Sequence, residues 1–145
     1  VRIQWSCCRK AIHVTPATKS PHHTLQVQFF FASDRGNPQL SNRYDILSPA
    51  PITMLKQISD ACQRHGVDAT ICGEIAGSPL DAMVMLALGY SRLSMPSASV
   101  GPVKRMVRSV NLGKLRHAFG QALQQSPQIN RSEIERIAKS LKIKL

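Results

Sequence analysis

The stretch from residue 67 to residue 88 constrains the fold of this chain more than any other. Residues 67–72 form a short, mostly apolar run, which predicts a strand. Ser78 has the form of a helix N-cap, with a proline at the next position and Asp81 completing a capping box, so we expect a helix over 79–88. A strand joined to a helix by a short loop is the repeating unit of α/β folds.

The loop between this strand and this helix, together with the last residue of the strand, holds the candidate reactive and ligand-binding residues. Gly73 and Gly77 allow the backbone to turn tightly and to approach a ligand closely. Cys72 stands at the carboxyl end of the strand, which is where parallel α/β barrels place their reactive groups. The alternative is a buried structural cysteine before an ordinary loop, and the residue types alone favour that alternative.

The rest of the chain continues the alternation of helices and strands. Apolar residues recur at helical spacing after residue 48, and Gly66 is expected to end that helix. We expect helices over about 48–65, 100–110, 112–123 and 130–141, and a second strand over 92–95. This order predicts an α/β fold of parallel βα units followed by carboxyl-terminal helices.

The composition is strongly basic, because 19 lysines and arginines outnumber 8 acidic residues and give a formal net charge of +11. Such a charge makes nucleic acid a candidate partner. The cations are spread over several elements, however, and no arginine-rich block or aromatic stacking motif accompanies them, which favours a solvated basic surface. No apolar run reaches the roughly 18 residues of a membrane span, so we expect no membrane partner.

The first 27 residues are unlike the remainder. They show no sustained period of 2 or 3.6 and carry no acidic residue, and Cys8 does not have the spacing of a metal ligand to His13. We therefore divide the chain into an unassigned basic leader, residues 1–27, which we expect to be disordered or non-native and to lack regular structure, and a folded part, residues 28–145. The 4 cysteines form no disulfide-like framework, which is typical of a reducing compartment.

Three ordered stretches carry a resemblance to a known family. Residues 72–77 read Cys-Gly-Glu-Ile-Ala-Gly, residues 34–37 read Asp-Arg-Gly-Asn, and residues 93–97 read Leu-Ser-Met-Pro-Ser. Together they resemble the signatures of the phosphoenolpyruvate (PEP)-utilising enzymes, in particular the PEP–protein phosphotransferases, and most closely the nitrogen-regulatory form. The resemblance runs from about Gln28 to the carboxyl end.

The resemblance implies a fold and a set of site residues. It places residues 28–145 in the last two to three βα units of a (β/α)8 TIM barrel, followed by carboxyl-terminal helices. It makes Cys72 the proton donor to the enolpyruvate that leaves PEP, and Arg35 a ligand of the PEP phosphate. Gly73 and Glu74 would form the loop near the ligand, and Glu74 is assigned no chemical step.

This chain departs from the family pattern at the metal site. The metal-binding aspartate of the family falls at residues 24–25, which are Thr-Leu here, so we find no recognisable ligand for the magnesium ion of the intact family. The domain that carries the phosphoryl-accepting histidine also has no recognisable counterpart. We therefore expect a fragment of a PEP–protein phosphotransferase, a kinase-type transferase, that is inactive by itself.

The resemblance also implies partners and a location. PEP or pyruvate would be the small-molecule ligand, a phosphocarrier protein would be the partner of the intact enzyme, and the barrel allows a homodimer in the bacterial cytoplasm. One alternative is a catalytically dead piece that serves only in binding or dimerisation. A small basic nucleic-acid-binding protein is a further alternative, and charge alone supports it.

Overall fold

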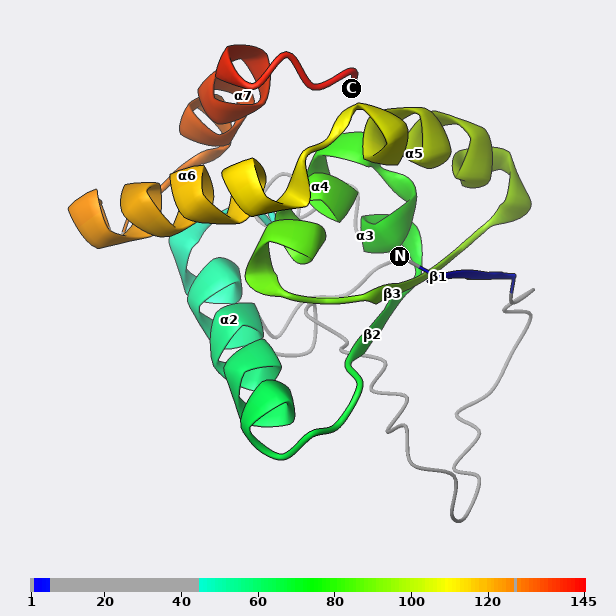
Figure 1. Ribbon diagram of the computed structural model, residues 1–145, viewed down its shortest axis with the longest axis horizontal. Coiled ribbons are helices and arrows are strands. Elements are labelled where there is room, and N and C mark those ends of the chain that lie inside the picture. Colours follow the sequence, from blue (N-terminus) through cyan, green and yellow to red (C-terminus); the bar gives the residue numbers. More distant parts are fainter. Residues whose placement is uncertain (1, 6–44, 127) are drawn as a thin grey trace, which may run out of the picture.

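The computed structural model describes residues 2–5, 45–126 and 128–145, and Figure 1 shows how their elements are arranged. Short strands and longer helices alternate along the chain. In order they are β1 (Arg2–Trp5), α2 (Pro49–Arg64), β2 (Thr70–Cys72), α3 (Glu74–Gly77), α4 (Pro79–Leu88), β3 (Arg92–Met95), α5 (Ser97–Ser109), α6 (Leu112–Gln125) and α7 (Arg131–Ser140).

The described strands form a parallel sheet in the order β1-β3-β2. The predicted pairing of the two later strands is confirmed, because β2 runs parallel to β3 and α4 connects them. The first of these strands is shorter than expected and begins at Thr70, three residues after the predicted start. The expected α/β class is therefore present as a small parallel sheet with helices, whereas closure into a barrel stays a prediction.

Strand β1 was not expected from the sequence. The leader over residues 1–27 was predicted to lack regular structure, yet Arg2–Trp5 pairs along its whole length with β3, with Ile3 opposite Leu93. A strand of 4 residues is too short to show a periodic pattern, and its backbone hydrogen bonds come from a distant segment. Residues 6–44 lie outside the described residues, so the division of the chain near residue 28 stays a prediction.

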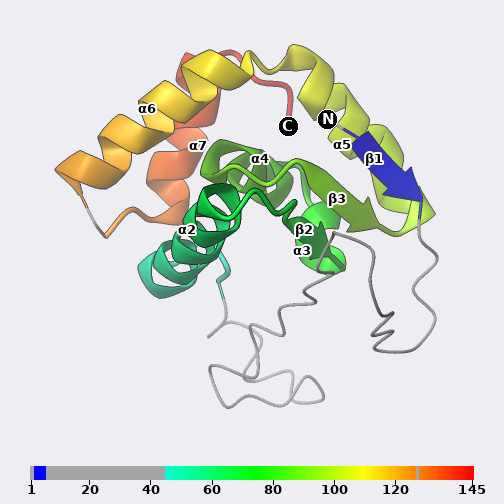
Figure 2. The same cartoon turned by 60° about the horizontal axis from the view of Figure 1, so that its bottom comes forward.

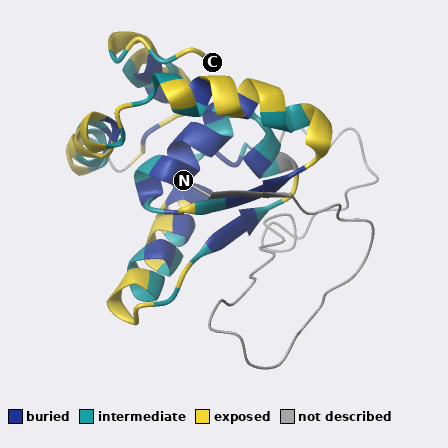
Figure 3. Ribbon diagram, turned by 45° about the vertical axis from the view of Figure 1, so that its right-hand side comes forward, coloured by how far each residue is buried: buried dark blue, intermediate teal, exposed yellow. Residues whose placement is uncertain are grey.

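Helix α4 is the centre of the hydrophobic core. It is apolar on every side, and its run from Ala82 to Leu86 is fully buried, as a helix of that composition must be. Figure 3 shows this burial along α4, and Figure 2 shows α5 and α6 as an outer layer over it. Because α4 also contacts α2 and α3, the whole fold is assembled around the helix that follows the glycine loop.

Apart from the start of α5 at Ser97, three residues before the expected start, the predicted helix ends and caps agree with the structure in all but one detail. Gly89 ends α4 in a left-handed conformation, and the side chain of Asn130 accepts a hydrogen bond from the backbone N–H of Glu133 at 3.0 Å. The capping box at Ser78 is the exception, because Ser78 is the N-cap of α4 but its side chain makes no capping bond. Ser78 is also the C-cap residue of α3, which ends at Gly77.

None of the helices in the described part of the chain is both long enough and apolar enough to cross a bilayer.

Candidate active-site loop

Cys72 is the last residue of β2, at the carboxyl edge of the sheet. Ile71, which precedes it, is buried in the hydrophobic core to which the apolar residues of α4 also belong. Since successive side chains of a strand point to opposite faces, Cys72 belongs to the other face of the sheet. Its partner in the pairing of β2 with β3 is Ser94, which is buried, while Cys72 itself is half-buried.

Gly73 turns the backbone sharply away from the sheet. Its φ of 99° lies in the region that side-chain-bearing residues rarely adopt, so glycine is required by backbone conformation. The backbone N–H of Gly73 donates a hydrogen bond of 3.0 Å to the carbonyl oxygen of Ser94. This bond extends the pairing of β2 and β3 by one residue and fixes the position from which the loop departs.

A one-turn helix, α3, replaces the irregular loop expected between β2 and α4. It begins at Glu74 and ends at Gly77, and its Ala76 is fully buried. A Cβ atom at Gly77 would lie 2.7 Å from the side-chain oxygen of Ser99 in α5. Glycine is therefore required here by space, because α3 and α5 approach each other closely at this point.

The face of the sheet that carries Cys72 is polar. By strand alternation and register it also carries Thr70, Arg92 and Ser94. Thr70 is 5% exposed, and its hydroxyl oxygen has no hydrogen-bond partner among the described residues. Arg92 forms an ion pair of 2.6 Å with Asp68 at the amino end of the strands, away from Cys72. Two adjacent parallel strands thus place a thiol and two buried hydroxyls on one face.

A charged cluster lies at the first turn of α4. The guanidinium of Arg131 donates to both carboxylate oxygens of Asp45, at 2.9 and 2.7 Å, and lies 3.6 Å from Asp81. Its hydrogen bonds lower the pKa of Asp45, whereas burial raises the pKa of Asp81. The amino terminus of α7 is thereby tied to the starts of α2 and α4. No short-range pattern in the sequence predicts this contact, because Arg131 is far along the chain from both acids.

Comparison with known proteins identifies the family. Residues 26–112 match the PEP-utilising enzymes over their PEP-binding domain, which is more than half of the 145 residues. The chain belongs to this family. It is 38% identical over 84 residues to the PEP-dependent phosphotransferase system protein of Salmonella typhimurium, covering 58% of this chain and 11% of that protein. It is 33% identical over 97 residues to the PEP–protein phosphotransferase of Haemophilus influenzae, covering 67% of this chain and 17% of that protein.

The chain therefore spans only a small part of these PEP-utilising relatives. A third relative, the PEP–protein phosphotransferase of Borreliella burgdorferi, is 30% identical over 96 residues, which are 66% of this chain and 17% of that protein. Similarity to a segment of a long protein supports descent from the same domain. The activity, substrates and partners of the whole protein do not follow from it.

The structure brings together three of the four predicted site residues. Cys72, Gly73 and Glu74 are consecutive and connect β2 to α3. Arg35 lies outside the described residues, so its predicted contact with a phosphate stays a prediction. Thr70 and Ser94 were not predicted as site residues. Strand alternation counted from Cys72 would have placed Thr70 on its face, whereas the position of Ser94 depends on the register between β2 and β3.

The described residues do not by themselves form a site for the magnesium ion of the PEP-utilising family. Hard cations such as magnesium are held by clustered carboxylates and other oxygen ligands. In residues 2–5, 45–126 and 128–145, no group of three or more His, Cys, Asp or Glu side chains is placed to hold a metal. We therefore derive no chemical step through a metal on this chain.

Proposed function

We propose that this chain contributes the PEP- and pyruvate-facing loop to the barrel of a PEP–protein phosphotransferase, with Cys72 as its proton donor. One observation carries the proposal. Cys72 ends a parallel strand on the face opposite the helical core, and Gly73 then turns the backbone away. In barrels built of βα units, that edge and that face are where substrates bind.

The chemistry assigned to Cys72 is a single proton transfer. When the phosphoryl group of PEP has passed to a protein histidine, the enolate of pyruvate remains. The S–H bond of Cys72 breaks, a C–H bond forms at the methylene carbon, and the product is pyruvate with a cysteine thiolate. A thiol suits this step because its ordinary pKa is close to neutral and environment can tune it.

The remaining assignments belong to the intact protein. Arg35 would bind the PEP phosphate through its planar fork of donors, and Gly73 and Glu74 would border the ligand. We assign the intact protein to the nitrogen-regulatory branch, with magnesium as cofactor, a phosphocarrier protein as partner, a homodimer as assembly and the bacterial cytoplasm as location. The names of the bacterial relatives support phosphoryl transfer from PEP, and the other assignments rest on the resemblance of residues 72–77 to the family signature.

The proposal is tested with the chain alone and with a chimera. Alone, with PEP, magnesium and the histidine-bearing domain of a relative, the chain is expected to release no pyruvate above background. Phosphoryl transfer depends on positioning and on cations around the transferring group, and most of the barrel is supplied elsewhere. In the chimera, residues 26–112 replace the matching segment of the Haemophilus influenzae relative, and pyruvate release is measured again.

The chimera is expected to turn over, and Cys72→Ala in it should lower the rate of pyruvate formation by about 10²- to 10⁴-fold. Cys62→Ala is the matched control, because Cys62 is a half-buried cysteine on α2, and it should leave the rate unchanged. A chimera whose rate is the same with and without the Cys72 thiol would overturn the proposal. An inert chimera that is folded would favour the alternative of a binding or dimerisation piece.

A further inference from the structure

Ser94 lies directly beside Cys72 on the neighbouring strand. The two residues are partners in the parallel pairing of β2 with β3, so their side chains are on the same face. The hydrogen bond of 3.0 Å from the N–H of Gly73 to the carbonyl of Ser94 holds the strands together at this point. Neighbouring strands are about 4.8 Å apart, so a serine hydroxyl can reach the sulfur of a paired cysteine.

The polarity of this face is unusual for the interior of this molecule. In the part of the chain that the structure describes, the buried polar residues are Ser59, Thr70 and Ser94, and two of these three are on the face of Cys72. The hydroxyl of Thr70 is buried and has no hydrogen-bond partner among the described residues. Because a buried hydroxyl without a partner costs free energy, this face is built to receive polar groups.

Two described polar side chains of β3, Arg92 and Ser94, are on the face of Cys72, and Ser94 is the one paired directly with Cys72. Arg92, two residues earlier on β3, is paired with Asp68 at 2.6 Å and lies at the amino end of the strands. On the carboxyl side the chain continues from Cys72 through Gly73 into α3. An ion pair at the far end of β3 cannot orient the thiol, whereas a hydroxyl in register with it can.

We propose that Ser94 is a positioning residue for Cys72, and this inference rests on the proton-donor role proposed above. Before the transfer, a hydrogen bond donated by the Ser94 hydroxyl to the sulfur directs the S–H bond toward the substrate side. After the proton has left, the same hydrogen bond stabilises the thiolate. A hydrogen bond to the charged form of a group lowers its pKa. Cys72 thereby becomes a stronger acid.

The test compares two side chains of equal size at position 94. Ser94→Thr keeps the hydroxyl and Ser94→Val removes it, so any strain from the added carbon is common to both variants. The rate at which iodoacetamide alkylates Cys72 is measured across pH in the full chain, with the modified peptide resolved by mass spectrometry from those of Cys7, Cys8 and Cys62. Ser91→Ala is the control, since Ser91 is exposed just before β3.

Ser94→Val is expected to raise the pH midpoint of alkylation by about one unit relative to Ser94→Thr, as loss of a hydrogen bond to a charged group implies. Ser91→Ala should match the unsubstituted chain. Should Ser94→Val fail to give a cooperative thermal melt, Ser94→Ala is compared with the unsubstituted chain under the same expectation. Equal midpoints with and without the hydroxyl would overturn the inference.

This measurement is independent of turnover, so the two proposals fail separately. If Cys72→Ala leaves the chimera active but the midpoint still shifts with Ser94, the proton-donor role is wrong and the Ser94 contact with sulfur stands. If turnover depends on Cys72 but the midpoint does not respond to position 94, the proton-donor role stands and Ser94 does not position the thiol.

Discussion

At the scale of single residues, the two glycines of the active-site loop are required for different physical reasons. Gly73 is required by its backbone, because its φ is 99° and a Cβ atom there would meet no neighbour within 4 Å. Gly77 is required by space, because the side chain of Ser99 occupies the position its Cβ would take. Both were predicted as loop glycines, and the steric reason for Gly77 became visible only when α5 was in place.

Gly77→Ala is expected to destabilise the fold by about 1–2 kcal/mol, since overpacking costs about 1–3 kcal/mol and the better helix propensity of alanine offsets up to about 1 kcal/mol. Its Cβ would lie 2.7 Å from the oxygen and 3.1 Å from the Cβ of Ser99. Urea unfolding measures the change. Gly120→Ala in α6 is the control, because its Cβ meets nothing within 4 Å, and it should stabilise by about 0.5–1 kcal/mol. A Gly77→Ala chain as stable as the Gly120→Ala chain would refute the argument.

The two aspartates around Arg131 respond to acid in opposite directions. Asp45 has a pKa below its ordinary value of 3.8 because Arg131 donates to its carboxylate, so its contribution to stability is lost as pH falls through the lowered pKa. Asp81 has a pKa above 3.8 because it is buried, so the stability linked to its protonated form is lost as pH rises through the raised pKa.

Asp45→Asn is expected to cost about 0.5–1 kcal/mol at neutral pH, a value reduced for solvent screening because the Asp45 side chain is 36% exposed. The difference from the unsubstituted chain should vanish as pH falls from about 5 to below the lowered pKa of Asp45. Asp81→Asn should instead steepen the loss of stability on acidification, because the opposing titration is removed. Urea unfolding across this pH range measures the stability of the unsubstituted chain and of both variants. Parallel curves of stability against pH for all three would contradict the opposite pKa shifts of Asp45 and Asp81.

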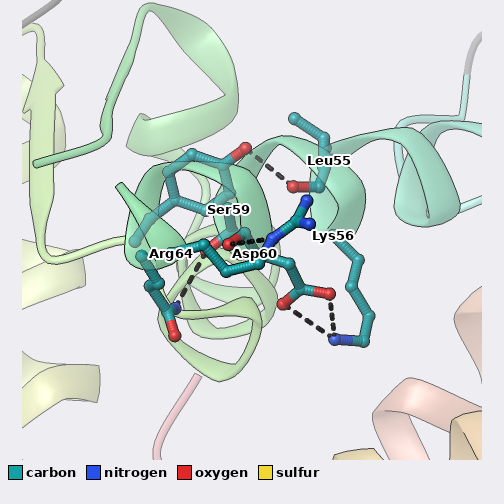
Figure 4. Close-up of polar contacts among 7 residues, drawn as sticks. Leu55, Lys56, Ser59, Asp60 and Arg64 are labelled. Atoms are coloured by element: carbon teal, nitrogen blue, oxygen red, sulfur yellow. Dashed lines mark hydrogen bonds and ion pairs between the residues drawn. The ribbon is translucent and has the colours of Figure 1, made fainter. Parts of the chain in front are cut away.

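At the scale of elements, one buried hydrogen bond joins α2 to the start of β3. The hydroxyl of Tyr90 donates to the backbone carbonyl of Leu55 at 2.9 Å, and burial raises the pKa of Tyr90 well above its ordinary value. Figure 4 shows Leu55 beside the exposed ion pair of Lys56 with Asp60, one turn apart on the same helix. The Tyr90 hydrogen bond is buried and the Lys56–Asp60 ion pair is exposed, so we expect the hydrogen bond to contribute more to the free energy of unfolding.

Tyr90→Phe is expected to lower the free energy of unfolding by about 1 kcal/mol, as typical for a lost internal hydrogen bond. Lys56→Ala is the control on the same helix, and it should change stability by less than about 0.5 kcal/mol because its ion pair is exposed. Denaturant unfolding measures the free energy of unfolding of both variants, and the slope of that free energy against denaturant concentration should stay unchanged. An equal effect of the two substitutions would show that the Tyr90 contact does not fasten α2 to the sheet.

At the scale of the whole molecule, the outer helices α5 and α6 carry lysines and arginines but no acidic residue. Residues 82–132 contain no aspartate or glutamate. The exposed cations of α5 and α6 are Lys104, Arg105, Arg108, Lys114 and Arg116, and none of them pairs with an acidic side chain of the described residues. Figure 1 shows the two helices following one another along one side of the molecule.

Duplex DNA is expected to bind this surface only weakly and without sequence preference. Such attachment releases counterions, so affinity should fall steeply between about 50 and 200 mM salt. Replacing Lys104, Arg105 and Arg108 by Gln should lower the slope of log affinity against log salt by up to roughly three. Fluorescence anisotropy with two unrelated duplexes measures both effects. Tight binding to one of the duplexes that survives physiological salt would make nucleic-acid binding the leading function.

The sequence by itself determined the local elements and the edge on which the candidate site lies. The apolar run, the proline after Ser78 and the glycine at 89 specify α4, and the run that ends in Cys72 specifies β2, because each signal acts within a few neighbouring residues. Only the tertiary structure decided the pairing of β1 with β3, the register that sets Ser94 beside Cys72, and the contact of Arg131 with Asp45. These contacts join segments far apart in the chain, and no short-range pattern records which distant residue will be the partner.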